Sequence, residues 1–275
     1  MLDLFLEALS FDGLIWILAA AFLAGLVKGF TGFGTALVFI PLVAQVLTSV
    51  EAVVSMVIFD FIGILPMVPR LSKDAKVPDV LRLGTGMILT TPIGLLALYL
   101  MSQSSFRLLA SVMILILLSL LIFGIRYRGE LTNRIIYLSG ALGGLFGGSA
   151  GMPGPPVILI YLASRSPPKI IRANLLLYAT FGDALIFVLC SLFFNISSLV
   201  FIFGIIAIIP FAIGVGLGSK VFNPKREGIF RAVAYIVIGF SAIYGLPIWG
   251  FEKDNSLAKY PKLYSQKAMG QKDLA

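Results

Sequence analysis

Three ionisable side chains, Lys28, Asp60 and Asp183, lie well inside stretches of sequence that are otherwise apolar. A charge near the centre of a bilayer costs about 2.5–3.5 kcal/mol on insertion scales, so each side chain implies a specific role. Lys28 is expected either to hold an anion or to extend along its helix to the cytoplasmic surface. The two aspartates are expected either to bind protons reversibly, as a carboxylate in a low-dielectric site can, or to hydrogen-bond to a neighbour or pair with Lys28.

A glycine-rich block occurs twice in the chain and interrupts the apolar pattern at matching places. Residues 23–42 read LAGLVKGFTGFGTALVFIPL and residues 142–161 read LGGLFGGSAGMPGPPVILIY. Glycine interrupts helices and lets a backbone or a ligand approach closely. Broken helices at corresponding positions of two halves indicate the binding site of a membrane transporter.

The two breaks are expected to form a site for an anion. A helix that restarts after a break exposes unpaired N–H groups and the positive end of its dipole, and proline suits its first turn. Two such restarts that face each other would surround an anion with backbone amides. The competing explanation, that glycines such as Gly25 and Gly144 allow close helix packing, is compatible with this one. The expected substrate-binding residues come from both breaks and from one later segment: Lys28, Gly29, Thr31, Gly32, Gly34, Thr35, Gly148, Ser149, Gly151, Pro153, Gly154 and Asn174.

The composition is that of a protein embedded in a bilayer. Hydrophobic residues make up 59% of the chain, charged residues make up 12%, and the mean hydropathy is +1.02. A soluble domain would carry about 25% charged residues. Apolar runs long enough to cross a ~30 Å hydrocarbon core recur along the chain, which predicts an all-α polytopic membrane protein. We expect no removable signal peptide at its start.

Several classes of chemistry are excluded by residues that the chain lacks. It has no histidine and a single cysteine, Cys190, which excludes a Ser-His nucleophile, histidine-ligated metals and an intramolecular disulfide. Residues 147–151 spell G-x-S-x-G, but the histidine and the strand of a nucleophile elbow are missing. We therefore expect no enzyme, no cofactor and no metal. The net charge of +8 comes from short basic loops, which indicate cytoplasmic loops and not a nucleic-acid partner.

Loop charges predict two inverted repeats. Matched loops of the two halves differ in charge, since residues 70–82 are basic whereas residues 194–197 are uncharged. Each half therefore crosses the membrane an odd number of times, and the chain reverses at both glycine breaks. Whether the short segments span fully or re-enter stays open. Ten apolar segments are expected, at about 14–30, 34–48, 50–69, 83–101, 106–125, 132–149, 153–164, 170–193, 198–219 and 229–249.

The expected organisation is a transmembrane repeat at 1–128, an inverted transmembrane repeat of about five segments at 129–250, and a polar tail at 251–275. The linker between the repeats is basic, with Arg126, Arg128 and Arg134. Because cytoplasmic loops collect lysine and arginine, this linker is expected to be cytoplasmic and both termini to lie outside.

The two glycine blocks resemble the signature blocks of the TauE/SafE sulfite exporter family of bacterial membrane proteins. The resemblance extends over about residues 13–249 and includes the arginines that open the last segment of each half, at Phe106-Arg107 and Phe230-Arg231. Residues 152–154 depart from it, reading Met-Pro-Gly where relatives tend toward a richer glycine run, and this bears on the substrate rather than the fold. The family's glycines map onto Gly25, Gly29, Gly32 and Gly34, then Gly144, Gly148, Gly151 and Gly154.

The resemblance implies an exporter in the bacterial inner membrane for small anions, such as sulfite or sulfur-containing organic acids like sulfoacetate. We expect a secondary transporter of sulfite, an organosulfonate or a related sulfur-containing or carboxylic acid. Asp60 and Asp183 are expected to couple it to protons, and the two repeats to provide alternating access. Its expected partners are the anion and the lipid bilayer, and the sequence leaves a homo-oligomer open.

Two other functions fit parts of the sequence. A passive anion channel would share the pattern of charges but would need no coupling carboxylate. An intramembrane aspartyl protease would use Asp60 and Asp183 as a catalytic pair. The protease is disfavoured because Thr180 stands where a glycine should precede Gly182-Asp183.

Overall fold

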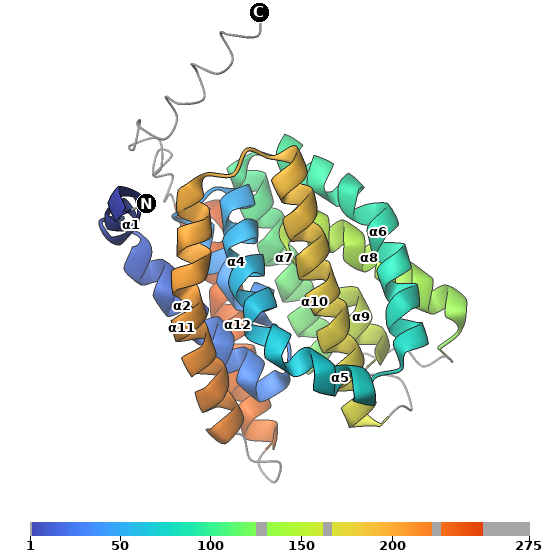
Figure 1. Cartoon of the computed structure of the whole chain (residues 1–275). Coiled ribbons are helices and arrows are strands. Elements are labelled where there is room, and N and C mark those ends of the chain that lie inside the picture. Colours follow the sequence, from blue (N-terminus) through green and yellow to red (C-terminus); the bar gives the residue numbers. More distant parts are fainter. Residues whose placement is uncertain (1, 125–130, 162–166, 222–226, 250–275) are drawn as a thin grey trace, which may run out of the picture.

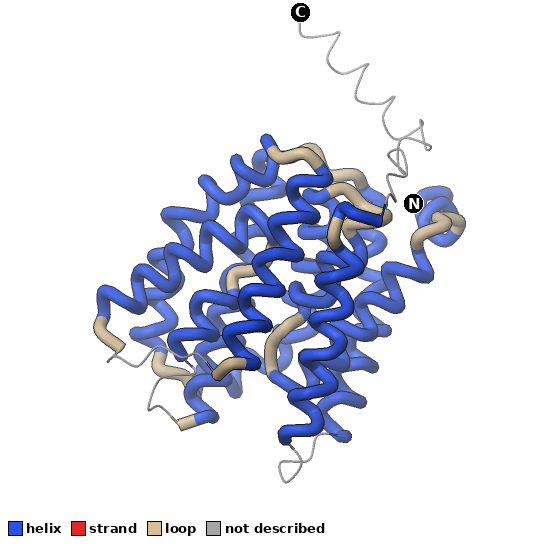
Figure 2. The backbone as a smooth tube through the Cα atoms, turned by 180° about the vertical axis from the view of Figure 1, so that it is seen from behind, coloured by secondary structure: helices blue, strands red, loops and turns tan. Residues whose placement is uncertain are grey.

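Helices make up the fold of the computed structural model, which describes residues 2–124, 131–161, 167–221 and 227–249, and these residues contain no strand (Figures 1 and 2). The all-α prediction is confirmed. Arg126, Arg128, Arg165, Lys225 and the tail at 251–275 lie outside the described residues. The helices are α1 Leu2–Leu9, α2 Leu14–Thr31, α3 Thr35–Val43, α4 Ser49–Ile64, η1 Leu65–Met67, α5 Val68–Asp74, α6 Val77–Leu100, α7 Gln103–Ile122, α8 Asn133–Ala150, α9 Gly154–Tyr161, α10 Pro168–Phe193, α11 Ser198–Val221, α12 Glu227–Gly245 and η3 Pro247–Trp249.

Seven helical stretches in the described part of the chain are long and apolar enough to cross a membrane. One of them is the continuous stretch Ser49–Asp74, which joins α4, η1 and α5. The other six lie in α2, α6, α7, α10, α11 and α12. The prediction of a multi-pass membrane protein is therefore confirmed. Helix α8 has 18 residues but also carries Asn133, Arg134 and many glycines, which lower its hydropathy.

The two short segments do not cross the membrane as continuous helices. Helix α3 has nine residues and α9 has eight. At about 1.5 Å per residue each extends roughly 12–14 Å, less than half of a ~30 Å hydrocarbon core. The chain reverses between α2 and α3, because Trp16 Nε1 at the start of α2 donates a hydrogen bond of 2.8 Å to the carbonyl of Leu42 near the end of α3.

Glycines bring the backbones of two helix pairs into close contact. A Cβ on Gly25 would lie 2.3 Å from the carbonyl oxygen of Phe211 in α11. In the same way, a Cβ on Gly148 would lie 2.5 Å from the carbonyl oxygen of Thr91 in α6. Side chains at these positions would collide with backbone, which explains why α2 packs along α11 and α8 along α6 so extensively. The packing role expected of Gly25 and Gly144 is confirmed, because a Cβ on Gly144 would lie 2.7 Å from the carbonyl oxygen of Met87.

The helix pairing has the same pattern in both halves of the chain. Helix α2, the first long helix of the first half, packs along α11, the fourth segment of the second half. Helix α8, the first long helix of the second half, packs along α6, the fourth segment of the first half. The third segments, α4 and α10, pack on each other, while α3 lies against α2 and α9 lies against α8. Two inverted repeats would produce this exchange of packing partners.

Helix α5, the start of α10 and the end of α11 lie at the same end of the bundle (Figure 1). Lys169 at the start of α10 pairs with Asp74 at the end of α5, at 2.8 Å. The end of α12 lies at the opposite end of the bundle, because Gln45 Nε2, in the turn before α4, donates a 3.0 Å hydrogen bond to the carbonyl of Tyr244. The described basic residues at the α5 end include Arg70, Lys73, Lys76, Arg82, Lys169, Arg172 and Lys220.

Candidate functional site

The first break is built by the sequence Thr31-Gly32-Phe33-Gly34. Gly32 ends α2 with φ +80°, and Gly34 precedes α3 with φ +102°, both in the left-handed region that favours glycine. The hydroxyl of Thr31 accepts a hydrogen bond of 3.2 Å from the N–H of Phe33 and lies 2.6 Å from the carbonyl oxygen of the same residue. Thr31 therefore holds the turn together, and α3 begins without a side-chain cap.

The second break has a similar shape with different residues. Gly151 ends α8 with φ +68°, and its N–H donates to the carbonyl of Gly147 at 2.9 Å. Helix α9 begins at Gly154, and Pro155 and Pro156 occupy its first turn, where proline was expected. The first-turn N–H groups of a helix have no partner within it, so both breaks present helix starts to their surroundings.

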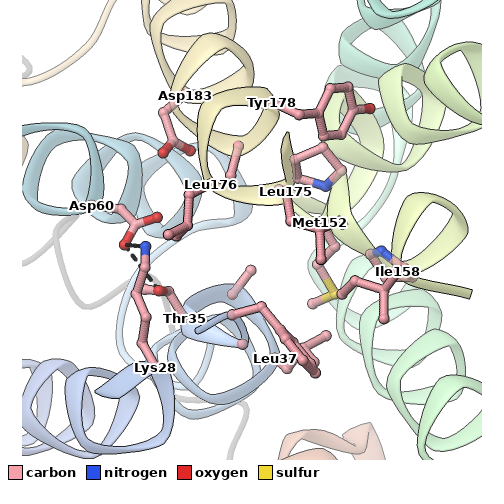
Figure 3. A pocket seen from close by; sticks show the side chains of 18 of the residues that line it. Lys28, Thr35, Leu37, Asp60, Met152, Ile158, Leu175, Leu176, Tyr178 and Asp183 are labelled. Carbon is pink, nitrogen blue, oxygen red and sulfur yellow. Dashed lines mark hydrogen bonds and ion pairs between the residues drawn. The ribbon is translucent and has the colours of Figure 1, made fainter. Parts of the chain in front are cut away.

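A cavity of about 70 Å³ lies between the two breaks. Its walls come from four parts of the chain: the first break with the start of α3, the second break with the start of α9, one face of α4, and one face of α10 (Figure 3). The lining residues that the sequence analysis singled out are Lys28, Gly32, Gly34, Thr35, Asp60, Gly151, Pro153, Gly154 and Asp183.

One end of the cavity holds a buried ion pair. Lys28 Nζ lies 2.5 Å from Asp60 Oδ1, and the hydroxyl of Thr35 donates to the same oxygen at 2.9 Å. Lys28 is 7% exposed and Asp60 is 5% exposed. The Lys28 ammonium also lies 5.6 Å from the centre of the Phe211 ring, within range of a cation–π contact. Lys28 therefore does not extend to the cytoplasmic surface. It is paired with Asp60 of α4.

Asp183 reaches into the same end of the cavity from α10, and its carboxylate points toward Asp60 (Figure 3). It is 3% exposed, and its Oδ2 has no hydrogen-bond partner among the described residues. A buried carboxylate oxygen without a partner is costly. The two aspartates, which the sequence placed on different halves of the chain, thus meet within one site with Lys28.

The rest of the cavity is apolar. Met152, Ile158 and Leu175 from the second half and Leu37 from the first half line it, with Tyr178 nearby (Figure 3). The hydroxyl of Tyr178 is turned away from this space and lies 3.4 Å from the carbonyl oxygen of Gly140, to which it donates a hydrogen bond. The cavity therefore has a charged end and an apolar end.

Five residues expected at the site lie outside the cavity lining. Gly29 and Gly148 face backbone of α11 and α6 respectively, and Thr31 organises the first break. Ser149 is buried in the last turn of α8. The side chain of Asn174 accepts a 2.8 Å hydrogen bond from the N–H of Lys76 and lies 3.3 Å from the hydroxyl of Tyr161, so it ties α10 to the start of α6.

Several neutral residues that line the cavity were not predicted from the sequence. Leu176 and Ala179 precede Asp183 by seven and four positions, and Met56 precedes Asp60 by four. Residues four apart lie on one helix face, so this spacing could have identified them. Arg172 was also missed as a neighbour of the site. Its Nε lies 3.4 Å from where a Cβ on Gly32 would be.

No group of three or more histidine, cysteine, aspartate or glutamate side chains suited to a metal occurs in the part of the chain that the structure describes. The polar side chains that line the cavity are those of Lys28, Thr35, Asp60, Tyr178 and Asp183. A bundle of membrane-crossing helices with two interrupted helices around a small charged cavity has the architecture of a membrane transport protein.

The chain belongs to the TauE/SafE sulfite exporter family. The family model described as "Sulfite exporter TauE/SafE" matches residues 17–245, which is most of the chain. The family consists of transporters, so the expectation that the chain is not an enzyme is confirmed and the aspartyl protease is set aside. No curated protein and no solved structure matches the chain.

Proposed function

We propose that the chain is a secondary transporter that exports a small anion across the bacterial inner membrane. The substrate binds in the cavity between the two helix breaks. The observation that carries this proposal is the ammonium of Lys28, buried at one end of a small cavity that the starts of α3 and α9 both line. A buried cation and two helix starts favour negative charge in the same small space.

The size of the cavity suits a small substrate. A water needs about 10–15 Å³ of such space, so a cavity of about 70 Å³ holds a group of on the order of five heavy atoms. Sulfite, a short sulfonate and a short carboxylate are of this size. The charged end would hold the anionic group beside Lys28 and Thr35, and the apolar end beside Met152 would accept a short organic part.

Alternating access between two inverted repeats is supported by the exchanged packing of the helices. Helices α2 and α11 pack along each other, as do α8 and α6, so each half contributes to both packed pairs. The cavity lies between the breaks of the two halves. Movement of one packed pair relative to the other would open the cavity to one side at a time.

Proton coupling is supported by two buried carboxyl groups that line the cavity, Asp60 and Asp183. A passive channel would need neither of them. A flux that follows the membrane potential and ignores a proton gradient would favour the channel.

A thermal-shift screen of the detergent-solubilised protein tests the proposed substrate class. The panel contains sulfite, methanesulfonate, ethanesulfonate, sulfoacetate, small thiols and acetate. A member that binds should stabilise the protein by about 2.7 kcal/mol at a concentration of one hundred times its Kd. The matched controls are the double variant Lys28→Met/Asp60→Asn, which should lose the shift, and Gly216→Ala, which should keep it. No shift with any anion, or the same shift in the double variant, would refute the proposal.

A further inference from the structure

The cation of the proposed anion site is already neutralised by the protein itself. Lys28 Nζ lies 2.5 Å from Asp60 Oδ1, and both side chains are more than nine-tenths buried. An anion that binds to Lys28 must therefore compete with a carboxylate fixed in the same low-dielectric space. The site as it stands is closed to an anion unless the negative charge of Asp60 is reduced.

The charge balance of the cavity leads to the same conclusion. Its ionisable groups that carry charge near neutral pH are Lys28, Asp60 and Asp183, whose charges sum to −1 when all three are ionised. A monoanion would bring this sum to −2 in a cavity of about 70 Å³. One proton on the aspartate pair restores it to −1, the value of the empty site. The Oδ2 of Asp183 has no hydrogen-bond partner among the described residues, which leaves an atom to carry that proton.

Among the described residues of the packed helices, no other charged group lines the cavity to offset this balance. Asp60 is faced by Lys28 from α2, by the neutral Thr35 from α3 and by Asp183 from α10. Helix α11 contributes the ring of Phe211, and its charge within Ser198–Val221 is confined to Lys220 in the last turn.

The charges of the remaining helices around α4 lie elsewhere. In α6, Asp79 is engaged by Lys76 and Arg82. In α7, Arg107 donates to the carbonyls of Gly245 and Leu246. On α10, Arg172 lies beside Gly32 and not in the cavity lining.

We propose that one proton binds the Asp60–Asp183 pair together with each monoanion, so that proton and anion occupy the site at the same time and cross the membrane in the same direction. This inference rests on the proposed function and adds the sign of its coupling. Protonation weakens the hold of the aspartates on Lys28, which then binds the anion. Binding linkage is reciprocal, so the anion in turn favours uptake of the proton.

Coupling of this sign makes export independent of the membrane potential. Because the loaded site carries the same charge as the empty site, the movement of a monoanion with its proton transfers no net charge. The membrane potential, which contributes about 2.3 kcal/mol per charge per 100 mV, then neither drives nor opposes it. Export would respond to the gradients of the anion and of protons alone.

Titration calorimetry of the purified full chain with ethanesulfonate tests the inference, with sulfite as a second probe. Ethanesulfonate stays a monoanion between about pH 5.5 and 8, and the chain has no histidine, so proton uptake in this range reports on perturbed groups of the protein. We expect the Kd to rise about tenfold per pH unit over part of this range, the slope of a one-proton linkage. Titrations in two buffers of different ionisation heat should show uptake of about one proton per anion.

Variants locate the proton. Asp60→Asn and Asp183→Asn each remove one negative charge permanently, so each should bind ethanesulfonate at pH 8 as tightly as wild type does at low pH, with no pH dependence. Asp74→Asn removes a carboxylate that pairs with Lys169, and neither residue lines the cavity, so this variant should keep the wild-type slope. Proton uptake is measured on the wild-type protein. The test of coupled proton and anion binding therefore does not depend on whether each variant folds.

Two results would overturn the inference while the proposed function stands. These are a Kd that does not change with pH, and a Kd that falls as the pH rises, which would mean that proton and anion exclude each other. If neither ethanesulfonate nor sulfite binds at any pH, both the proposed function and the inference fall.

Discussion

The buried Lys28–Asp60 pair is the residue-scale feature on which stability and binding both depend. Taking two charges out of water is costly, and the pair is tolerated because the contact is short and Thr35 adds a hydrogen bond to Asp60. The cost of a charge within the membrane singled out Lys28, Asp60 and Asp183 from sequence alone. Their pairing could not be predicted, because it depends on how α2, α4 and α10 meet in space.

Lys28→Met should destabilise the protein by about 3–5 kcal/mol, because it leaves Asp60 as an uncompensated buried charge. Lys28→Met/Asp60→Asn should recover most of that loss, since it removes both charges. Thermal unfolding in detergent measures both effects. A single variant as stable as wild type would mean that the pair is not formed in the folded protein.

At the scale of elements, the two glycine blocks have two separate physical roles. The earlier glycines let helices touch backbone to backbone, as Gly25 and Gly29 do on α11. The later ones adopt left-handed backbone at the breaks, as Gly32, Gly34 and Gly151 do. Sequence spacing predicted both roles and the restarts at α3 and α9. Sequence spacing could not assign a role to Gly29 and Gly148, which lie between these two groups. Both were expected at the site, but both lie at helix contacts. Their role depends on the register of α2 on α11 and of α8 on α6, which the sequence does not reveal.

Gly29→Ala and Gly148→Ala should each destabilise the protein by about 1–3 kcal/mol, because the added methyl group meets fixed backbone. The new Cβ would lie 2.6 Å from the carbonyl oxygen of Val215 and 2.5 Å from that of Thr91, respectively. Gly216→Ala is the matched control within α11, since nothing lies within 4 Å of its Cβ position. This control should be neutral or stabilising by up to about 1 kcal/mol. Equal melting temperatures for all three variants would contradict the packing described for α2, α8 and α11.

At the scale of the whole molecule, hydropathy and loop charge predicted the helical bundle and the order of its segments. They could not predict the cavity, because its volume depends on how the two breaks, α4 and α10 fit together. Most of the described basic residues outside the cavity lie on segments at the α5 end of the bundle, with Arg107 at the opposite end, and the positive-inside rule makes the α5 end cytoplasmic. The turn between α10 and α11 then lies outside.

Single-cysteine labelling tests this orientation in a Cys190→Ala background, where no native thiol remains. Lys73→Cys and Lys220→Cys should react with a membrane-impermeant maleimide only from the cytoplasmic side, in inside-out vesicles. Asn195→Cys, in the exposed turn between α10 and α11, should react only from the outside, in intact cells. If cysteines at positions 73 and 220 were labelled from opposite sides, the reversal of the chain at the glycine breaks would be wrong.

The central claim is that the cavity between the two breaks holds the anion. Selenite has the shape and charge of sulfite, and its selenium gives an anomalous X-ray signal. Diffraction from crystals of the purified protein soaked in selenite at low pH therefore tests this claim most directly. We expect an anomalous peak between the breaks, within hydrogen-bonding distance of Lys28 Nζ and weakened in crystals at high pH. An empty cavity at low pH, with selenium bound only at the basic surface around α5, would contradict it.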